Sequence, residues 1–144
     1  TFSGYGLDIG VLFKPIEQLK FGVNIQDITG TPIQWQNTPT QPTDIIPINV
    51  KVGAAFSQKI KVIDSLVTLC LDGDTKYDLR THGGAELWYK NTVVGRVGFL
   101  NQQGIAKPQL TLGAGFIAFF LELDYAYVAY DIMPLNYFSA IARF

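Results

Sequence analysis

Apolar and polar residues alternate along most of this chain with a period of two, as in β-strands whose two faces meet different surroundings. Between Leu19 and Gln26, every second residue is Leu, Phe, Val or Ile, and the residues between them are Lys, Gly, Asn and Gln. The last stretch, Asn136 to Phe144, alternates in the same way and ends on an aromatic residue. No segment has a helical period of useful length, so the pattern predicts an all-β protein.

The alternation predicts about nine strands in an antiparallel, up-and-down order. They are expected at Gly4–Phe13, Leu19–Gln26, Ile48–Phe56, Leu66–Asp72, Thr81–Tyr89, Val93–Leu100, Gln109–Phe116, Phe119–Val128 and Asn136–Phe144. Pro15 cannot continue a ladder, so we expect a turn over residues 14–18. The polar stretch Asp27–Ile45, with three prolines, is expected to be a surface loop.

Connection lengths alternate as well. Those after the first, fifth and seventh predicted strands are short, and those after the second, fourth, sixth and eighth are longer and more polar. Every second connection therefore falls on one rim of the sheet, as in membrane barrels with short periplasmic turns and long outer loops.

Composition supports a membrane environment. Charged residues make up 16% and apolar residues 48% of the chain, and the mean hydropathy is +0.19. Yet no apolar run approaches the ~20 residues that a membrane helix needs, whereas the expected strands approach the ~9–11 residues of a tilted membrane strand. The sequence therefore predicts an antiparallel up-and-down transmembrane β-barrel, with its apolar face toward lipid.

Aromatic residues gather near the expected strand ends. One set falls near the short-turn rim: Phe13, Phe21, Phe56, Tyr89, Phe116, Phe119 and Phe144. A second set falls near the other rim: Tyr5, Phe99, Tyr127 and Phe138. Two aromatic girdles are typical of the two membrane interfaces, although aromatic residues are also enriched in strands generally.

The terminal Phe144 resembles the signal by which the assembly machinery recognises the last strand of outer-membrane barrels. A complete bacterial barrel has an even number of strands and both ends on the periplasmic side. Nine strands that end at the short-turn rim would begin at the opposite rim. We therefore expect residues 1–144 to be a single barrel domain that forms the C-terminal part of a larger barrel.

Two ordered sets of motifs carry a family resemblance. The first is Gly4–Pro15 followed by Leu19–Ile25, and the second is Gly84–Tyr89, Gly95–Phe99, Gly113–Phe116 and Leu123–Tyr127. Their order and spacing resemble the C-terminal half of PorV/PorQ-type proteins, outer-membrane barrels similar to the FadL hydrocarbon transporters.

The resemblance implies a Gram-negative outer membrane and a barrel of about 14 strands with an N-terminal plug. It also implies a role in type IX protein secretion or in the transport of hydrophobic compounds. The implied partners are outer-membrane lipid, the barrel assembly machinery, and secreted client proteins or hydrophobic small molecules.

Polar side chains collect on the face expected to line the lumen. The candidates are Lys20, Asn24, Lys51, Glu86, Arg96, Glu122, Asp124 and Arg143. A three-residue turn at Lys90–Thr92 would place Glu86 opposite Arg96. These groups could form a polar track for a solute, or a structural ion-pair network inside a narrow barrel.

Two further features have two explanations each. Glycines recur on the expected inward face, which indicates either the close approach of another backbone, such as a plug, or strong barrel curvature. Trp35 in the long loop could anchor a protein or glycan partner, or could form the small core of a loop that folds over the barrel mouth.

Other function classes are disfavoured. The 11 basic and 12 acidic residues show no nucleic-acid footprint, and one cysteine and one histidine provide no zinc motif. We expect no cofactor and no enzyme, since a hydrolase would need a serine beside His82 and an acid. The alternative is a soluble lipocalin-like or β-sandwich binding module, in which the apolar face would be the buried one.

Overall fold

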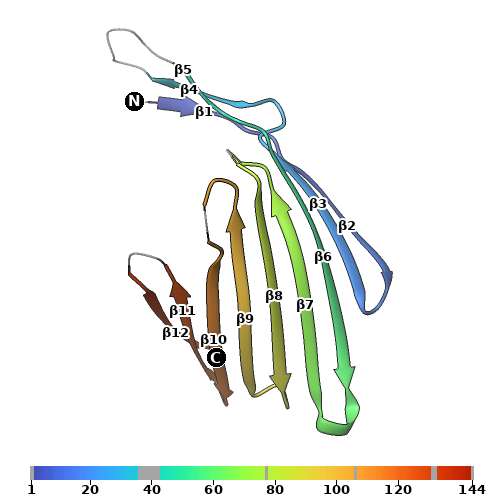
Figure 1. Cartoon of the computed structure of the whole chain (residues 1–144). Coiled ribbons are helices and arrows are strands. Elements are labelled where there is room, and N and C mark those ends of the chain that lie inside the picture. Colours follow the sequence, from blue (N-terminus) through green and yellow to red (C-terminus); the bar gives the residue numbers. More distant parts are fainter. Residues whose placement is uncertain (1, 36–42, 77, 106, 131–132, 144) are drawn as a thin grey trace.

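The computed structural model describes residues 2–35, 43–76, 78–105, 107–130 and 133–143, which form two antiparallel sheets. The larger has nine strands in the order β12-β11-β10-β9-β8-β7-β6-β3-β2 (Figure 1). Their bounds are β2 Ile9–Ile16, β3 Leu19–Gln26, β6 Asn49–Ile60, β7 Ser65–Asp74, β8 Arg80–Tyr89, β9 Val93–Gln102, β10 Gln109–Ala118, β11 Leu121–Ala129 and β12 Leu135–Ala142.

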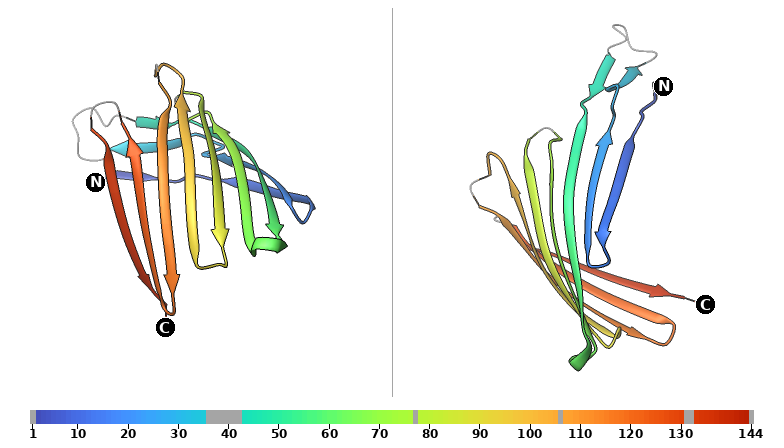
Figure 2. Two further views of the ribbon diagram at one scale, coloured as in Figure 1. Left: turned by 60° about the horizontal axis from the view of Figure 1, so that its bottom comes forward. Right: turned by 90° about the vertical axis from the view of Figure 1, so that its right-hand side faces the viewer.

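The predicted all-β, antiparallel, up-and-down architecture is confirmed. The predicted second strand begins and ends as expected, at Leu19 and Gln26. In the described part of the chain, the one helical element is a 3₁₀ turn at Lys61–Ile63. The sheet curls but is not closed: β2 and β12 are its two edges, and both run toward the same rim (Figures 1 and 2).

No helix among the residues described has the length and apolar character required to pass through a membrane.

The predicted loop Asp27–Ile45 is wrong in part, because it contains two strands. β4 (Thr31–Trp35) lies between β1 (Phe2–Gly4) and β5 (Thr43–Ile46) in a separate three-stranded sheet. In the chain, β1 precedes β2, β4 follows β3, and β5 precedes β6, so this sheet prolongs three neighbouring strands of the larger one. We call it the extension; it projects beyond the rim in the right-hand view of Figure 2.

An aspartate fixes the junction between the larger sheet and the extension. Asp27 adopts a left-handed conformation with φ 53°, and its backbone N–H donates to Asp8 Oδ1 at 2.9 Å. Its own carboxylate accepts a hydrogen bond from the Thr31 hydroxyl, and Ile28 N–H donates to Leu7 O at 3.0 Å. These bonds occur where the regular ladders of both sheets are interrupted, so they define the bend between them.

Other strand ends also differ from the prediction. β2 passes through Pro15 to Ile16, with a register shift after Phe13. It is an edge strand, where a missing N–H is tolerated. β6 continues to Ile60, so the predicted connection Ser57–Ser65 is largely strand.

The connections define two rims. The short-turn rim carries residues 17–18, 61–64, 90–92 and 119–120, and the end of β12 lies there too (Figure 1). The long-loop rim carries the connections from β7 to β8, from β9 to β10 and from β11 to β12, and the extension between β3 and β6. The predicted alternation of short and long connections is therefore confirmed.

The strand ends are staggered regularly along the long-loop rim. The last pairs of successive hairpins are Gln26–Asn49, Asp74–Arg80, Leu100–Gln109 and Val128–Leu135. Through the ladders, these pairs are in register with Asn49, Lys51, Gly53 and Ala55 of β6. The rim therefore shifts by one residue for each strand.

The register divides the sheet into two chemically different faces. The apolar face contains no charged residue in any of the nine strands, and its polar residues Gln58, Ser65, Thr81, Asn101 and Asn136 lie within two residues of a strand end. The polar face contains every charged residue of these strands. The predicted aromatics Phe13, Phe21, Phe56, Tyr89 and Phe116, and Phe99, Tyr127 and Phe138, all belong to the apolar face.

In the middle of the sheet, in β9 and β10, exposure is reversed relative to a water-soluble sheet. Along β9, every apolar-face residue is exposed and every polar-face residue is partly or fully buried. Among the described residues the one fully buried hydrophobic side chain is Val94, on the polar face. The chain exposes 10502 Å², against about 7,400 Å² expected for a compact monomer of its mass.

Candidate functional site

The predicted lumen candidates lie together on the polar face. Lys20 and Asn24 are in β3, Lys51 in β6, Glu86 in β8, Arg96 in β9, and Glu122 and Asp124 in β11. Arg143 follows β12 and joins them through an ion pair to Glu122, Nη2 to Oε2, at 2.5 Å. The polar face is therefore the candidate site.

The central group joins four side chains from three strands. Glu86 and Arg96 are direct register partners, as the three-residue turn predicts, and Arg96 Nε donates to Glu86 Oε2 at 2.7 Å. Arg96 Nη1 donates to Asp124 Oδ1, also at 2.7 Å. Trp88 Nε1 donates to Glu86 Oε1 at 2.5 Å, and its ring lies 5.6 Å from the Arg96 guanidinium carbon. One guanidinium thus binds two carboxylates and offsets part of their charge, which lowers the cost of placing them on a partly buried face.

The central group depends on open space above β10, through which Arg96 reaches Asp124. Arg96 reaches Asp124 across β10, where Gly113 pairs with Arg96 and Gly115 pairs with Asp124. A Cβ at Gly115 would collide with Asp124 Oδ1 and would lie 2.8 Å from Val94 Cγ1. Gly115 is therefore explained by neighbouring side chains that occupy its space, a reason other than the plug or the curvature expected from the sequence. At Gly113 a Cβ would make only ordinary contacts, such as 3.4 Å to Arg96 Cβ.

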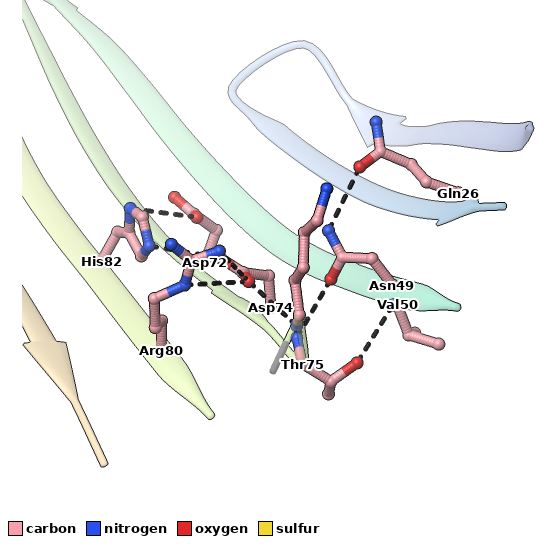
Figure 3. A network of polar contacts seen from close by, with 9 residues as sticks. Gln26, Asn49, Val50, Asp72, Asp74, Thr75, Arg80 and His82 are labelled. Atoms are coloured by element: carbon pink, nitrogen blue, oxygen red, sulfur yellow. Dashed lines mark hydrogen bonds and ion pairs between the residues drawn. The ribbon is translucent and has the colours of Figure 1, made fainter. Parts of the chain in front are cut away.

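A second group lies at the long-loop rim (Figure 3). The guanidinium of Arg80 binds Asp74 Oδ1 through Nη2 at 2.8 Å and through Nε at 3.2 Å. His82 lies between two carboxylates, with Nδ1 at 3.9 Å from Asp72 Oδ2 and Nε2 at 3.4 Å from Asp74 Oδ2. Its Nε2 atom is shielded from solvent but lacks the geometry of a hydrogen bond.

Amides extend this second group toward β3. Asn49 is fully buried; its Nδ2 donates to Gln26 Oε1 at 3.1 Å, and its Oδ1 accepts from Thr75 N–H at 3.2 Å. Figure 3 shows these side chains in a row along the ends of β3, β6, β7 and β8. The row fixes the loop after Asp74 against the strand ends.

The third feature is a separation of charge across the sheet. On the polar face of β3 and β6, the charged residues are the lysines Lys20, Lys51 and Lys59, whereas every acidic residue lies on β7, β8 or β11. Within the described part of the chain, neither Lys20 nor Lys51 has an ion-pair partner within 4.0 Å. The polar face thus has a basic side and a more acidic side.

Between the central group and the rim group the polar face is hollowed. The hollow has a volume of about 480 Å³ and is lined by Thr68, Cys70, His82, Gly84, Glu86, Arg96, Gly98 and Thr111, among others. Its lining is mostly small residues with charged groups at both ends. It is a recess in one wall of a curled sheet, open on the side opposite the wall.

The structure assembles little catalytic or metal-binding chemistry among the residues described. It contains no group of three or more His, Cys, Asp or Glu side chains that could hold a metal ion. Cys70 Sγ makes a weak contact with Gly84 O at 3.6 Å. Ser139 lies on β12, where it pairs with Asp124 of β11. It is four strands away from His82 on β8, so Ser139 and His82 are not brought together.

Sequence reasoning missed three contributions to these groups. The Trp88 indole joins Glu86 although both are on one strand, and Asp74 and Arg80 were assigned to a loop rather than to strand ends. Trp35 lies in β4 rather than in a loop, and its side chain is outside the described part of the structure. Phe144 also lies outside the described residues.

Comparison of the chain with known protein families, with curated protein sequences and with solved structures finds no match.

Proposed function

We propose that this sheet is a section of the wall of an outer-membrane β-barrel, with its apolar face in lipid and its polar face toward the lumen. One observation carries the proposal: a nine-stranded sheet exposes a charge-free face and keeps every charge on the opposite face, which along β9 and β10 is the less exposed one. In water, covering such a face would be strongly favourable. In a bilayer, the acyl chains cover it and the charges remain among polar groups.

The stagger of the strands supports the same proposal. A shift of one residue per strand, at about 3.3 Å per residue and about 4.8 Å between strands, corresponds to a tilt of roughly 35° if the rim is level. Transmembrane barrels have tilts of roughly 35–45°. Strands of 8 to 12 residues at this tilt would match an apolar band about 25 Å tall.

The directions of the two edges indicate how such a wall would close. Because β2 and β12 run toward the same rim, antiparallel closure requires an odd number of additional strands. The resemblance to PorV/PorQ-type barrels, with about 14 strands, would supply five. That resemblance is also the basis for proposing hydrophobic compounds or secreted client proteins as the cargo.

A soluble lipocalin-like or β-sandwich module is the competing proposal. It would gather the apolar face into a dry interior, but Leu7, Val23, Val52, Leu69 and Leu123 are all exposed. Only a second sheet over the apolar face could turn this arrangement into a sandwich. The membrane proposal needs no such layer.

Extraction of cell envelopes tests the two proposals directly. We expect the protein to stay in the outer-membrane fraction after high-salt and carbonate washes, and to require detergent for release. Recovery as a monodisperse protein in buffer without detergent would overturn the membrane proposal. Loss of hydrocarbon uptake or of secreted proteins in cells that lack it would then identify the cargo.

A further inference from the structure

The short-turn rim carries apolar side chains at the tips of two separate turns. Phe119, in the turn between β10 and β11, is 101% exposed, and Val62, in the 3₁₀ turn between β6 and β7, is 95% exposed. Ile63 beside it is 50% exposed. Turn tips are usually polar or glycine-rich, so these side chains call for an explanation outside the sheet.

Phe119 also occupies a backbone position that suits glycine. The turn has two residues, since Ala118 pairs with Leu121, and Phe119 has φ 54° while Phe120 is not left-handed. This is the pattern of a type II′ turn, in which the first central residue is usually Gly. A bulky aromatic residue there is strained, and such strain is concentrated where it serves a function.

Lysines accompany the apolar tips. Lys61 lies in the 3₁₀ turn and Lys90 in the turn between β8 and β9, where its Nζ lies 5.2 Å from the centroid of the Tyr89 ring. Asp64, the acid on the same turn as Lys61, is paired with Lys59 at 3.7 Å. Among the described residues, Lys61 and Lys90 have no acidic partner within 4.0 Å.

Apolar tips with lysines between them fit a phospholipid headgroup layer. Aromatic and aliphatic side chains insert at the boundary between headgroups and acyl chains, and lysines bind the phosphates. The tips stand on different turns, separated by the β8–β9 turn, so they form part of a ring. A protein partner would instead be expected to meet a contiguous patch with a central anchor.

We infer that the short-turn rim is seated in the headgroup layer of an anionic phospholipid leaflet. Phe119 and Val62 insert as anchors, and Lys61 and Lys90 bind lipid phosphates. The inference rests on the proposed barrel. It adds to that proposal the depth of the short-turn rim in the bilayer and the class of lipid around it.

Spin labels can measure this depth. In the protein with Cys70→Ser, reconstituted in vesicles of phosphatidylcholine and phosphatidylglycerol, single cysteines at Phe119, Val62, Val97 and Gln103 are labelled with a nitroxide. Collisions with oxygen and with a water-soluble nickel chelate are then compared. We expect the label at Val97, in the middle of the apolar face, to be deep, those at Phe119 and Val62 to lie near the phosphates, and that at Gln103 to be in water.

The outcomes separate the inference from the proposal beneath it. If positions 119 and 62 are as open to nickel as position 103 while position 97 is deep, the anchor is overturned and the barrel stands. If position 97 is also open to nickel, the barrel proposal fails as well.

A charge variant tests the lipid class. Lys61→Gln with Lys90→Gln should move the label at position 119 toward water in vesicles with phosphatidylglycerol, and should have little effect in pure phosphatidylcholine. An unchanged depth in both would overturn the role of the lysines.

Discussion

At the scale of single residues, the polar face depends on glycine positions as much as on charged side chains. Arg96 can bind Glu86 on one neighbouring strand and Asp124 two strands away because Gly115 on β10 leaves open the space that the Asp124 carboxylate occupies. On the apolar face, the Phe99 ring covers Gly83, its register partner. Glycine thus has different roles on the two faces.

Replacing Gly115 by Ala tests this explanation. The new Cβ would displace Asp124 or Val94 and break the contact with Arg96, which should lower the free energy of unfolding by about 1–3 kcal/mol. Gly95→Ala on the neighbouring strand is the matched control, because its Cβ would meet no atom within 4 Å; it should be neutral or stabilise by up to about 1 kcal/mol. Urea unfolding in phospholipid vesicles measures both, and equal effects would contradict the explanation.

At the scale of elements, the sequence was sufficient to predict the strands that have one apolar and one polar face. Leu19–Gln26 was predicted residue for residue because each side chain reports the face on which it lies. The same logic placed Glu86 opposite Arg96, since a three-residue turn fixes the register locally. The contact with Asp124 could not be predicted as firmly, because it crosses a strand and depends on what β10 leaves empty.

The extension could not be found in this way. β4 and β5 are short, and their residues do not alternate between apolar and polar. Pro32 argued against a strand, but it pairs with Ile45 in β5 and has no register partner in β1. What positions the extension is the left-handed turn at Asp27 and its bond from Asp27 N–H to Asp8, which is a long-range feature.

Asp27→Val should loosen the extension without unfolding the larger sheet. A β-branched residue disfavours the left-handed conformation, and Val cannot accept the bond from Thr31. Hydrogen exchange should accelerate at the amides of Thr31, Ile33 and Gln34, while those of β7 to β10 stay protected. Asp27→Asn should behave like the original protein, because Asn tolerates this conformation and keeps an acceptor; equal exchange in both variants would refute the role given to Asp27.

At the scale of the whole molecule, the chain has almost no core of its own. Val94 is the one fully buried hydrophobic side chain among the residues described. The backbone ladders and the ion pairs of the polar face hold the strands in register, but the apolar face gains its stabilisation from whatever covers it. In the proposed barrel that partner is lipid.

A pair of arginine substitutions asks which face meets lipid. Ala114 lies mid-strand on the apolar face of β10, and Ala126 lies on the polar face of β11, paired with Gly113. Ala114→Arg should destabilise the protein folded in vesicles by about 2–4 kcal/mol, the cost of arginine near the bilayer midplane. Ala126→Arg, two residues from Asp124 on the same face of β11, should cost much less, and the opposite order would reverse the assignment of the faces.

The common direction of β2 and β12 also governs how two such sheets could meet. Copies inserted with the same orientation would bring an edge β2 beside an edge β12 with the strands parallel, so the antiparallel ladder of each sheet could not continue into the next. Pairing like edges antiparallel would require one copy to be upside down in the bilayer. In the proposed barrel, the odd number of strands in this sheet therefore works against edge-to-edge polymerisation before the two edges are joined into a closed wall.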